Sequence, residues 1–449
     1  MKRVVVTGLG PVSSIGIGKE TFWENARQGR GYFRNVDFDD VDFDDVDMEQ
    51  YRSRIVSPID SFDPEEYVSR GRKLKRCSRA TQYMVTGTFL ALQDAGLSIK
   101  EAPEKSKIDP WPYPIEGVDP MRCGIIIGQS VSNPDIMVTR HAGFIRNRGP
   151  MRLNPSTLPQ SNINVGATTA AEWFCLRGIN LTIATACSSA SHAIGMAAMN
   201  IQNGLEDIVV TGGAEGTYEP YLLGGFDIIR ALSTRNDDPM TASRPFDRGR
   251  DGFVLGEGAG ILVLEELNHA LKRGARIYAE LAGYGYTTDA YNIVAPDPLG
   301  RSSIEAVRRA LSMAKTSPEE VEYINAHGTS TVLNDPNESY IIKQFFGDYA
   351  YKIPISSSKS LFGHSLGAAA GIESLITVLT VMHDTITPTI NLDDPDVDYR
   401  DPNFPDLDKR CDLDYVPKKM REQQVNIALN ESFGFGGQNG VLVFRKFDQ

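Results

Sequence analysis

Short runs rich in Val, Ile and Leu alternate along the chain with longer segments in which apolar residues recur at helical spacing. The short runs predict strands at 3–7, 124–127, 181–185, 208–211, 260–265, 277–281, 353–356 and 441–444. The longer segments predict helices at 80–95, 188–203, 302–314, 338–346 and 366–383. This alternation indicates an α/β or layered α/β/α architecture.

One sequence pattern occurs twice. The segment from Phe253 to Leu264 (FVLGEGAGILVL) resembles the segment from Phe433 to Phe444 (FGFGGQNGVLVF), 180 residues later. The same offset carries Cys187 to position 367, close to His364. We therefore expect two halves, 1–273 and 274–449, that each present a strand-to-helix turn to one shared site. Chance recurrence of Gly-rich loops before strands is the alternative.

Three segments have the composition of surface insertions. Residues 36–45 hold a tandem acidic repeat, 101–120 is charged and rich in Pro, and 394–408 is rich in Asp and Pro. We expect each of them to be a solvated loop. The acidic repeat lacks the glycine and terminal Glu of an EF-hand, so a calcium site there is disfavoured.

Composition and charge exclude several classes of function. The chain carries 46 Lys and Arg against 58 Asp and Glu, a net charge of −12, which argues against broad nucleic-acid binding. Five widely spaced cysteines without a CxxC motif argue against disulfides or zinc and favour a cytoplasmic location. We find no secretory leader and no run of about 18 apolar residues, and so expect no membrane insertion.

Cys187 is a candidate nucleophile. It stands where the extended run at 181–185 ends and the predicted helix from 188 begins, followed by small residues. A helix start offers unpaired N–H groups and a positive dipole end, both of which favour the thiolate. Taken alone, the position suits a buried structural cysteine equally well.

Two histidines follow predicted strands in the second half. His327 comes after the apolar stretch from Val321, and His364 follows the strand at 353–356. Sites in α/β folds lie beyond strand ends. Each histidine alone is more often structural, but with Cys187 they would provide a nucleophile and two neutral imidazole donors.

Several motifs together resemble the β-ketoacyl-acyl-carrier-protein synthases, especially the elongating synthase II type. They include Thr185-Ala-Cys187-Ser-Ser, Arg230-Ala-Leu-Ser-Thr-Arg-Asn236, Asn325-Ala-His327-Gly-Thr-Ser-Thr331, Lys359 through His364, and Ser432-Phe-Gly-Phe-Gly-Gly437. The resemblance covers nearly the whole chain. It implies a thiolase fold with two βαβαβαββ halves in a five-layered α/β/α/β/α core, and a homodimer.

The resemblance also implies roles for the site. Cys187 would accept the acyl group, and His327 and His364 would stabilise the enolate formed when the malonyl unit loses carbon dioxide. Lys359 would hold His364, with a salt bridge to Glu373 as its structural alternative. Other expected members are the oxyanion hole and gate (backbone N–H of Cys187 and Phe435, with Phe433), the pantetheine contacts (Thr329 and Thr331) and the polar support (Asp335). No metal or cofactor is expected, because both substrates ride on the phosphopantetheine arm of acyl carrier protein.

A basic cluster on this acidic chain is the predicted docking site for an acidic carrier protein. It comprises Arg70, Arg72, Lys73, Lys75 and Arg76, together with Arg230 near the same entrance. Such a cluster can steer an acidic partner. An ordinary solvated helix start is the alternative.

The sequence departs from the family pattern near the expected acyl pocket. Ser130-Val-Ser-Asn133 replaces a Gly-rich turn, and Thr157 stands where a larger aromatic often reaches in from the partner subunit. With Phe226 lining the pocket, the small Val131 and Thr157 predict a preference for long or unusual acyl chains. Glu431 replaces the more usual Asn before Ser432.

Other functions remain open at this stage. A ketosynthase of a specialised pathway (polyketide, polyene or unusual lipid) would use the same chemistry. A non-catalytic chain-length factor would lack the cysteine, a thiolase needs a second catalytic cysteine, and an initiating synthase uses Cys-His-Asn. Chain length, pathway, carrier identity and homodimer versus heterodimer are left undetermined.

Overall fold

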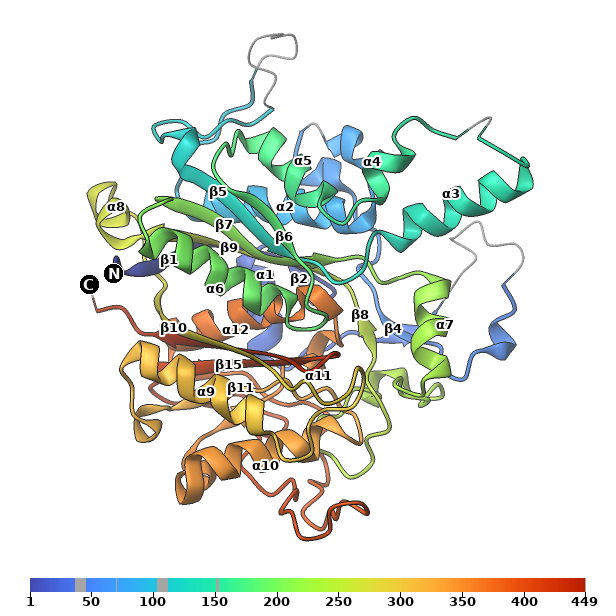
Figure 1. Cartoon of the computed structure of the whole chain (residues 1–449), viewed down its shortest axis with the longest axis vertical. Coiled ribbons are helices and arrows are strands. Elements are labelled where there is room, and N and C mark those ends of the chain that lie inside the picture. The colour runs from blue at the N-terminus through green and yellow to red at the C-terminus, as the bar shows by residue number, and fades with distance from the viewer. Residues whose placement is uncertain (37–45, 70, 103–111, 151–152, 449) are drawn as a thin grey trace.

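The computed structural model describes residues 1–36, 46–69, 71–102, 112–150 and 153–448 of the chain. Helices and two sheet regions stack in five layers, with helices outside, a sheet on each side, and helices in the middle (Figure 1). The fold is therefore α/β, and the predicted five-layered arrangement is confirmed.

The main sheet contains the same strand arrangement twice. Its first half runs in the order β6-β5-β7-β9-β1 and its second half in the order β12-β11-β15-β16-β10. The first-half strands are β1 (Val4–Ser13), β5 (Cys123–Gly128), β6 (Asn180–Ile183), β7 (Ile208–Glu215) and β9 (Gly258–Glu266). The second-half strands are β10 (Ala279–Thr288), β11 (Tyr323–Asn325), β12 (Ile355–Ser356), β15 (Ile427–Gly434) and β16 (Gln438–Arg445).

Strand directions repeat as well. Strand β5 pairs in parallel with β6 and β7, and β11 pairs in parallel with β12 and β15, while the remaining ladders within each half are antiparallel. A short antiparallel contact between β1 and β10 joins the halves. The chain passes between them after α8 (Leu267–Lys272). The division at 273/274 lies in this connection and stays a prediction.

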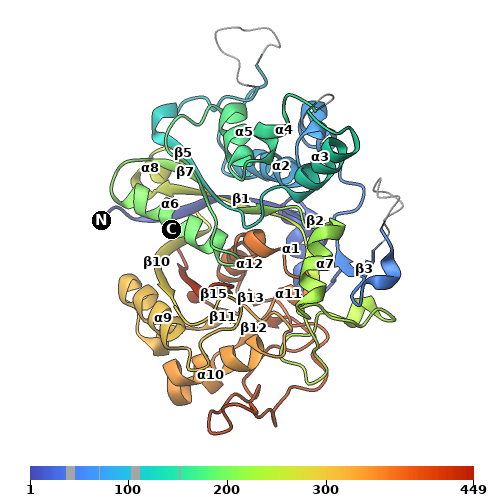
Figure 2. The same ribbon diagram turned by 45° about the vertical axis from the view of Figure 1, so that its right-hand side comes forward.

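Two long helices form the central layer. α6 (Ser189–Gln202) and α12 (Ala369–His383) contact each other and strands of both halves, and the turned view keeps them between the two sheets (Figure 2). Strands β7 and β9 are buried along their whole length because helices cover both faces. The close approach needs glycine: a Cβ on Gly260 would lie 2.1 Å from the backbone nitrogen of Ile372 in α12.

Helices on the outer faces complete the layers. α2 (Arg79–Asp94) and α5 (Val165–Phe174) cover the first half, and α9 (Arg301–Ala314) and α10 (Asn334–Phe346) cover the second. The smaller helices are α1 (Lys19–Arg27), α3 (Pro134–Arg146), α4 (Thr157–Ser161), α7 (Pro220–Ile228) and α11 (Lys359–Phe362). Short strand pieces are β2 (Gly16–Ile17), β3 (Arg34–Asn35), β4 (Ile55–Ser57), β8 (Leu255–Gly256), β13 (Thr385–Ile386) and β14 (Arg421–Glu422).

One central helical segment has the composition of a membrane-spanning helix. Leu366–His383 has the length and mean hydropathy (1.5) of such a helix, although Glu373, Ser374, Thr377 and Thr380 interrupt its apolar residues. Within the protein, 89% of this window is buried, because it is the central helix that both halves cover.

The predicted insertions differ from expectation in one case. Segment 394–408 is not simply solvated: Asp396 and Asp401 are buried and form ion pairs with Arg250 and Lys409. Most of the acidic repeat, including residues 37–45, lies outside the described residues, as does 103–111 of the second segment.

Candidate active site

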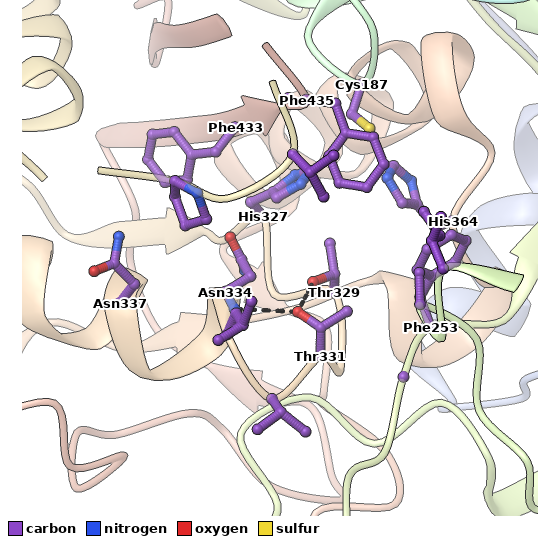
Figure 3. A pocket seen from close by; sticks show the side chains of 18 of the residues that line it. Cys187, Phe253, His327, Thr329, Thr331, Asn334, Asn337, His364, Phe433 and Phe435 are labelled. Carbon is purple, nitrogen blue, oxygen red and sulfur yellow. Dashed lines mark hydrogen bonds between the residues drawn. The ribbon is translucent and has the colours of Figure 1, made fainter. Parts of the chain in front are cut away.

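Four residues that the sequence predicts to take part in the reaction line one cavity. Cys187 lies between β6 and α6, His327 follows β11, His364 follows α11, and Phe435 follows β15. All four face a space of about 210 Å³ (Figure 3). Because β6 and β12 occupy the same place in the two repeats, segments distant in sequence converge on one cavity.

The turn that presents Cys187 is strained and anchored. Ala186, the residue before it, has a left-handed φ of 50°, which costs a non-glycine residue ~1–3 kcal/mol. Ser188 Oγ donates to the carbonyl oxygens of Ser432 at 3.0 Å and Gln438 at 2.8 Å. These bonds join the cysteine turn to the loop that carries Phe435.

The Cys187 sulfur is a thiol at rest. Burial raises the pKa of the Cys187 thiol to about 11, although the Lys359 ammonium and the backbone N–H of Phe435 both act to lower it. The backbone N–H groups at the helix start favour the thiolate, as the sequence predicts, but desolvation of the charged sulfur has the larger effect on the pKa.

Two neutral imidazoles stand edge to face beside the thiol. The ring centroids of His327 and His364 are 5.4 Å apart, with an interplanar angle of 86°. Burial lowers the pKa of both rings well below the usual value; Lys359 adds to the effect at both rings, and His364 adds to it at His327. Both rings are therefore uncharged at neutral pH.

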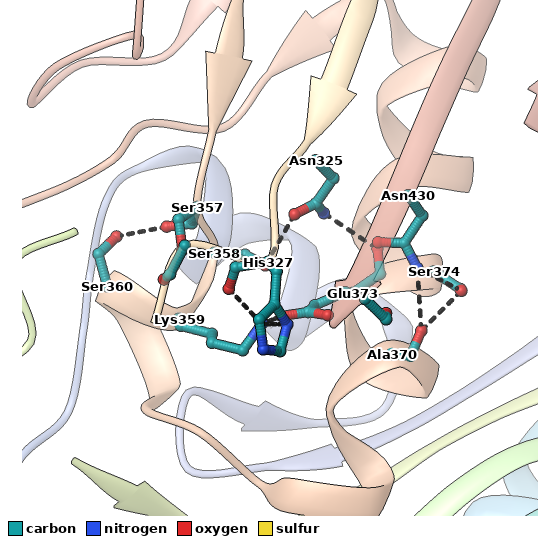
Figure 4. Close-up of polar contacts among 12 residues, drawn as sticks. Asn325, His327, Ser357, Ser358, Lys359, Ser360, Ala370, Glu373, Ser374 and Asn430 are labelled. Carbon is teal, nitrogen blue, oxygen red and sulfur yellow. Dashed lines mark hydrogen bonds and ion pairs between the residues drawn. The ribbon is translucent and has the colours of Figure 1, made fainter. Parts of the chain in front are cut away.

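Lys359 contacts His327 and not His364, which corrects the expected pairing (Figure 4). Its Nζ donates to the His327 carbonyl oxygen at 2.6 Å, lies 3.3 Å from His327 Nδ1, and forms an ion pair with Glu373. An ammonium has no acceptor, so Nδ1 of His327 accepts and Nε2 carries the hydrogen. His364 Nδ1 has no hydrogen-bond partner among the described residues.

Two carboxylates of α10 hold the loop that follows His327. Glu338 accepts the backbone N–H groups of His327 at 2.6 Å and Gly328 at 2.7 Å. Asp335 accepts the backbone N–H of Ser330 at 3.1 Å. Asp335 was predicted as polar support. Glu338 was missed because it reads as an ordinary helix residue in the sequence.

The remaining predicted lining residues divide into two groups. Thr329, Thr331, Phe226, Phe433 and Arg230 line the cavity, and the two threonine hydroxyls are 2.9 Å apart. Phe253, which the sequence reading missed, packs edge to face on His364 with centroids 5.3 Å apart. Val131 and Thr157 are not among the described lining residues of the cavity.

The predicted docking cluster lies on a short 3₁₀ segment (Gly71–Arg76). Lys73 and Arg76 are exposed, whereas Lys75 forms ion pairs with Asp63 at 2.8 Å and Glu65 at 3.0 Å. Arg70 and the side chain of Arg72 lie outside what the structure describes. Only part of the cluster is therefore seen to be free for a partner.

No group of three or more His, Cys, Asp or Glu side chains suited to a metal ion occurs within the described ranges. All five cysteines are free thiols.

Comparison with known proteins places the chain among condensing enzymes. Residues 1–270 match the profile of the β-ketoacyl synthase N-terminal domain, and residues 278–393 match that of the C-terminal domain. The chain is 40% identical over 446 residues to a 3-oxoacyl-[acyl-carrier-protein] synthase 2 from Synechocystis sp., covering 99% of this chain and 98% of the relative. A protein of the same name from Coxiella burnetii is 38% identical, covering 100% and 99%.

Solved structures show the same relationship. A β-ketoacyl synthase from Burkholderia phymatum superposes with a TM-score of 0.84 at 31% identity, covering both chains fully. A type II PKS acyl-carrier protein in complex with its ketosynthase superposes with a TM-score of 0.82 at 32% sequence identity. The ishigamide ketosynthase/chain length factor superposes with a TM-score of 0.83 at 31% identity, and both matches cover the full length of both chains.

Proposed function

The chain belongs to the β-ketoacyl synthase family, and we propose that it lengthens an acyl chain by decarboxylative condensation with a malonyl unit carried on acyl carrier protein. The observation that carries the proposal is the single cavity shared by Cys187, His327 and His364. A chain-length factor that only binds would not need this nucleophile.

In the first half-reaction, Cys187 takes the acyl group from the carrier. Its sulfur attacks the thioester carbonyl, a new sulfur–carbon bond forms, and the carrier thiol leaves with the proton that the cysteine loses. The backbone N–H groups of Cys187 and Phe435 are the oxyanion donors in this proposal. The contact from the Phe435 N–H to the sulfur, which acts to lower the thiol pKa, supports it.

In the second half-reaction, the malonyl thioester loses carbon dioxide. The electron pair of the broken bond moves to the thioester oxygen as an enolate, which accepts hydrogen bonds from His327 and His364. The enolate carbon attacks the acyl-Cys187 carbonyl, and the cysteine sulfur leaves as a thiolate that takes up a proton from solvent. Each neutral ring carries one N–H, which it can donate to the enolate oxygen. Thr329 and Thr331 would contact the pantetheine arm.

The carrier protein approaches the rim that holds Arg230. The exposed Lys73 and Arg76, on a chain of net charge −12, support docking of an acidic carrier. We further propose a homodimer through the edge strand β6, where Leu181 is 39% exposed, and a cytoplasmic location consistent with five free thiols.

The test uses the purified protein with malonyl-carrier and hexanoyl-carrier. Mass spectrometry should show hexanoyl mass on the Cys187 peptide, followed by the β-ketoacyl-carrier product. The matched control is Cys123→Ala, which removes a buried cysteine of β5 that does not line the cavity. Normal product formation by Cys187→Ala would refute the proposal.

A further inference from the structure

Glu431 is a buried acid that the proposed reaction does not use. It lies on β15, is fully buried, and neither of its carboxyl oxygens has a hydrogen-bond partner within the described part of the chain. A buried acid without donors is stable only as the neutral carboxylic acid.

The sheet register places Glu431 beside the start of the His327 loop. Asn325 of β11 pairs with Asn430 of β15, so Glu431 is one residue beyond this pair, level with the residue that precedes His327. Asn430 donates to α12 residues, and successive strand residues face opposite ways. Glu431 therefore faces the α10 side of the sheet, as does Leu429, which packs with Ile342 of α10.

Glu338 of α10 is the charged group that faces Glu431. It is fully buried, and its oxygens accept the backbone N–H groups of His327 and Gly328, with Asn334 Nδ2 at 3.2 Å. The other charged groups around Glu338 are Asp335 on α10 and Lys359 on α11. Glu338 has three donors and Glu431 has none, so Glu338 is the better able of the two to carry a negative charge, although burial raises its pKa to about 7. Burial first, and then the neighbouring Glu338, raise the pKa of Glu431 well above its usual value.

We propose that Glu431 is a positioning residue for His327. It stays uncharged beside Glu338, and ionisation of Glu431 puts a second negative charge beside Glu338 and loosens the two backbone hydrogen bonds that fix the His327 loop. The inference rests on the proposed function, since Glu431 matters to the reaction only through His327.

The experiment measures the stability of the His327 loop and the rate of decarboxylation separately. Amide hydrogen exchange, corrected for the intrinsic rate at each pH, reports protection of the segment at 326–329 from pH 6 to 9. Decarboxylation of malonyl-carrier without an acyl primer is measured over the same range. The variants are Glu431→Gln, which supplies an uncharged amide of the same shape, and Glu206→Gln as a control, which alters a buried acid in the other half of the molecule.

The expected result is a loss of protection with rising pH in the wild type, of roughly tenfold or more, as for weakening of one charge-assisted hydrogen bond. Glu431→Gln should keep its protection, whereas Glu206→Gln should behave as the wild type. Decarboxylation should follow protection in each protein. If protection falls but decarboxylation does not follow, Glu431 still positions the loop, and the role proposed for His327 is overturned.

Constant protection in the wild type, or the same pH dependence in Glu431→Gln, would overturn the inference. If Glu431→Gln does not fold, Glu431→Asn takes its place, since Asn is the more usual residue at this position and carries no charge. Protection of segment 326–329 that falls with rising pH in Glu431→Asn as it does in the wild type would overturn the inference.

Discussion

The buried ion pair between Lys359 and Glu373 allows a quantitative test of the site. Both side chains are essentially inaccessible, at 1% and 0% exposure. Glu373→Gln keeps the shape but leaves the ammonium without its counter-ion. Removing one partner of such a pair destabilises a protein by ~3–5 kcal/mol, because the remaining charge stays buried.

The expected shift in melting temperature follows from chain length. With an unfolding entropy of about 2.1 cal/mol/K per residue, a chain of 449 residues has about 0.9 kcal/mol/K in total. Glu373→Gln should therefore melt about 3–5 °C below the wild type in differential scanning calorimetry. The double variant Lys359→Met/Glu373→Leu removes both charges at similar volume and should melt above the single variant.

Catalysis should not recover with stability. The double variant lacks the ammonium that contacts His327 Nδ1 and the His327 carbonyl, so malonyl decarboxylation should stay impaired. Glu305→Gln, at an exposed ion pair with Arg308, is the control and should melt with the wild type. The reasoning is refuted if Glu373→Gln melts with the wild type, or if the double variant melts no higher than Glu373→Gln.

Three further outcomes follow from the same cavity. Alkylation of Cys187 by iodoacetamide, followed on its peptide, should accelerate about tenfold per pH unit between pH 7 and 10, because the thiol pKa of about 11 lies above this range; a plateau below pH 9 would contradict it. His364→Ala should slow malonyl decarboxylation by about 10²–10³-fold and acyl transfer to Cys187 far less, as measured by carbon dioxide release and by protein mass. In the proposed homodimer, where Val131 and Thr157 would meet at the acyl pocket, a ladder of acyl-carriers should acylate Cys187 faster with long chains than with acetyl, because both side chains are small, although neither lines the cavity of the single chain; preference for acetyl would refute this.

Much of the fold was predictable because its elements are strongly patterned. The predicted helix at 188–203 is α6 (Ser189–Gln202), and the predicted strand at 208–211 begins β7. The strand β15 was not predicted, since Asn, Glu and Ser interrupt its apolar run. Of these residues, Asn430 donates to α12, whereas the side chains of Glu431 and Ser432 have no hydrogen-bond partner within the described part of the chain.

The sequence alone determined the chemical groups of the site and their order along the chain. Cys187, His327 and His364 were identifiable because each follows a strand and stands in a specific motif. Tertiary structure decided what these groups are beside: Lys359 contacts His327 instead of His364, Glu338 clamps the next loop, and desolvation keeps the cysteine protonated. Contacts and burial of this kind arise between segments more than a hundred residues apart or on facing elements. Local sequence does not predict them, because the ionisation of a side chain depends on the neighbours that folding brings to it.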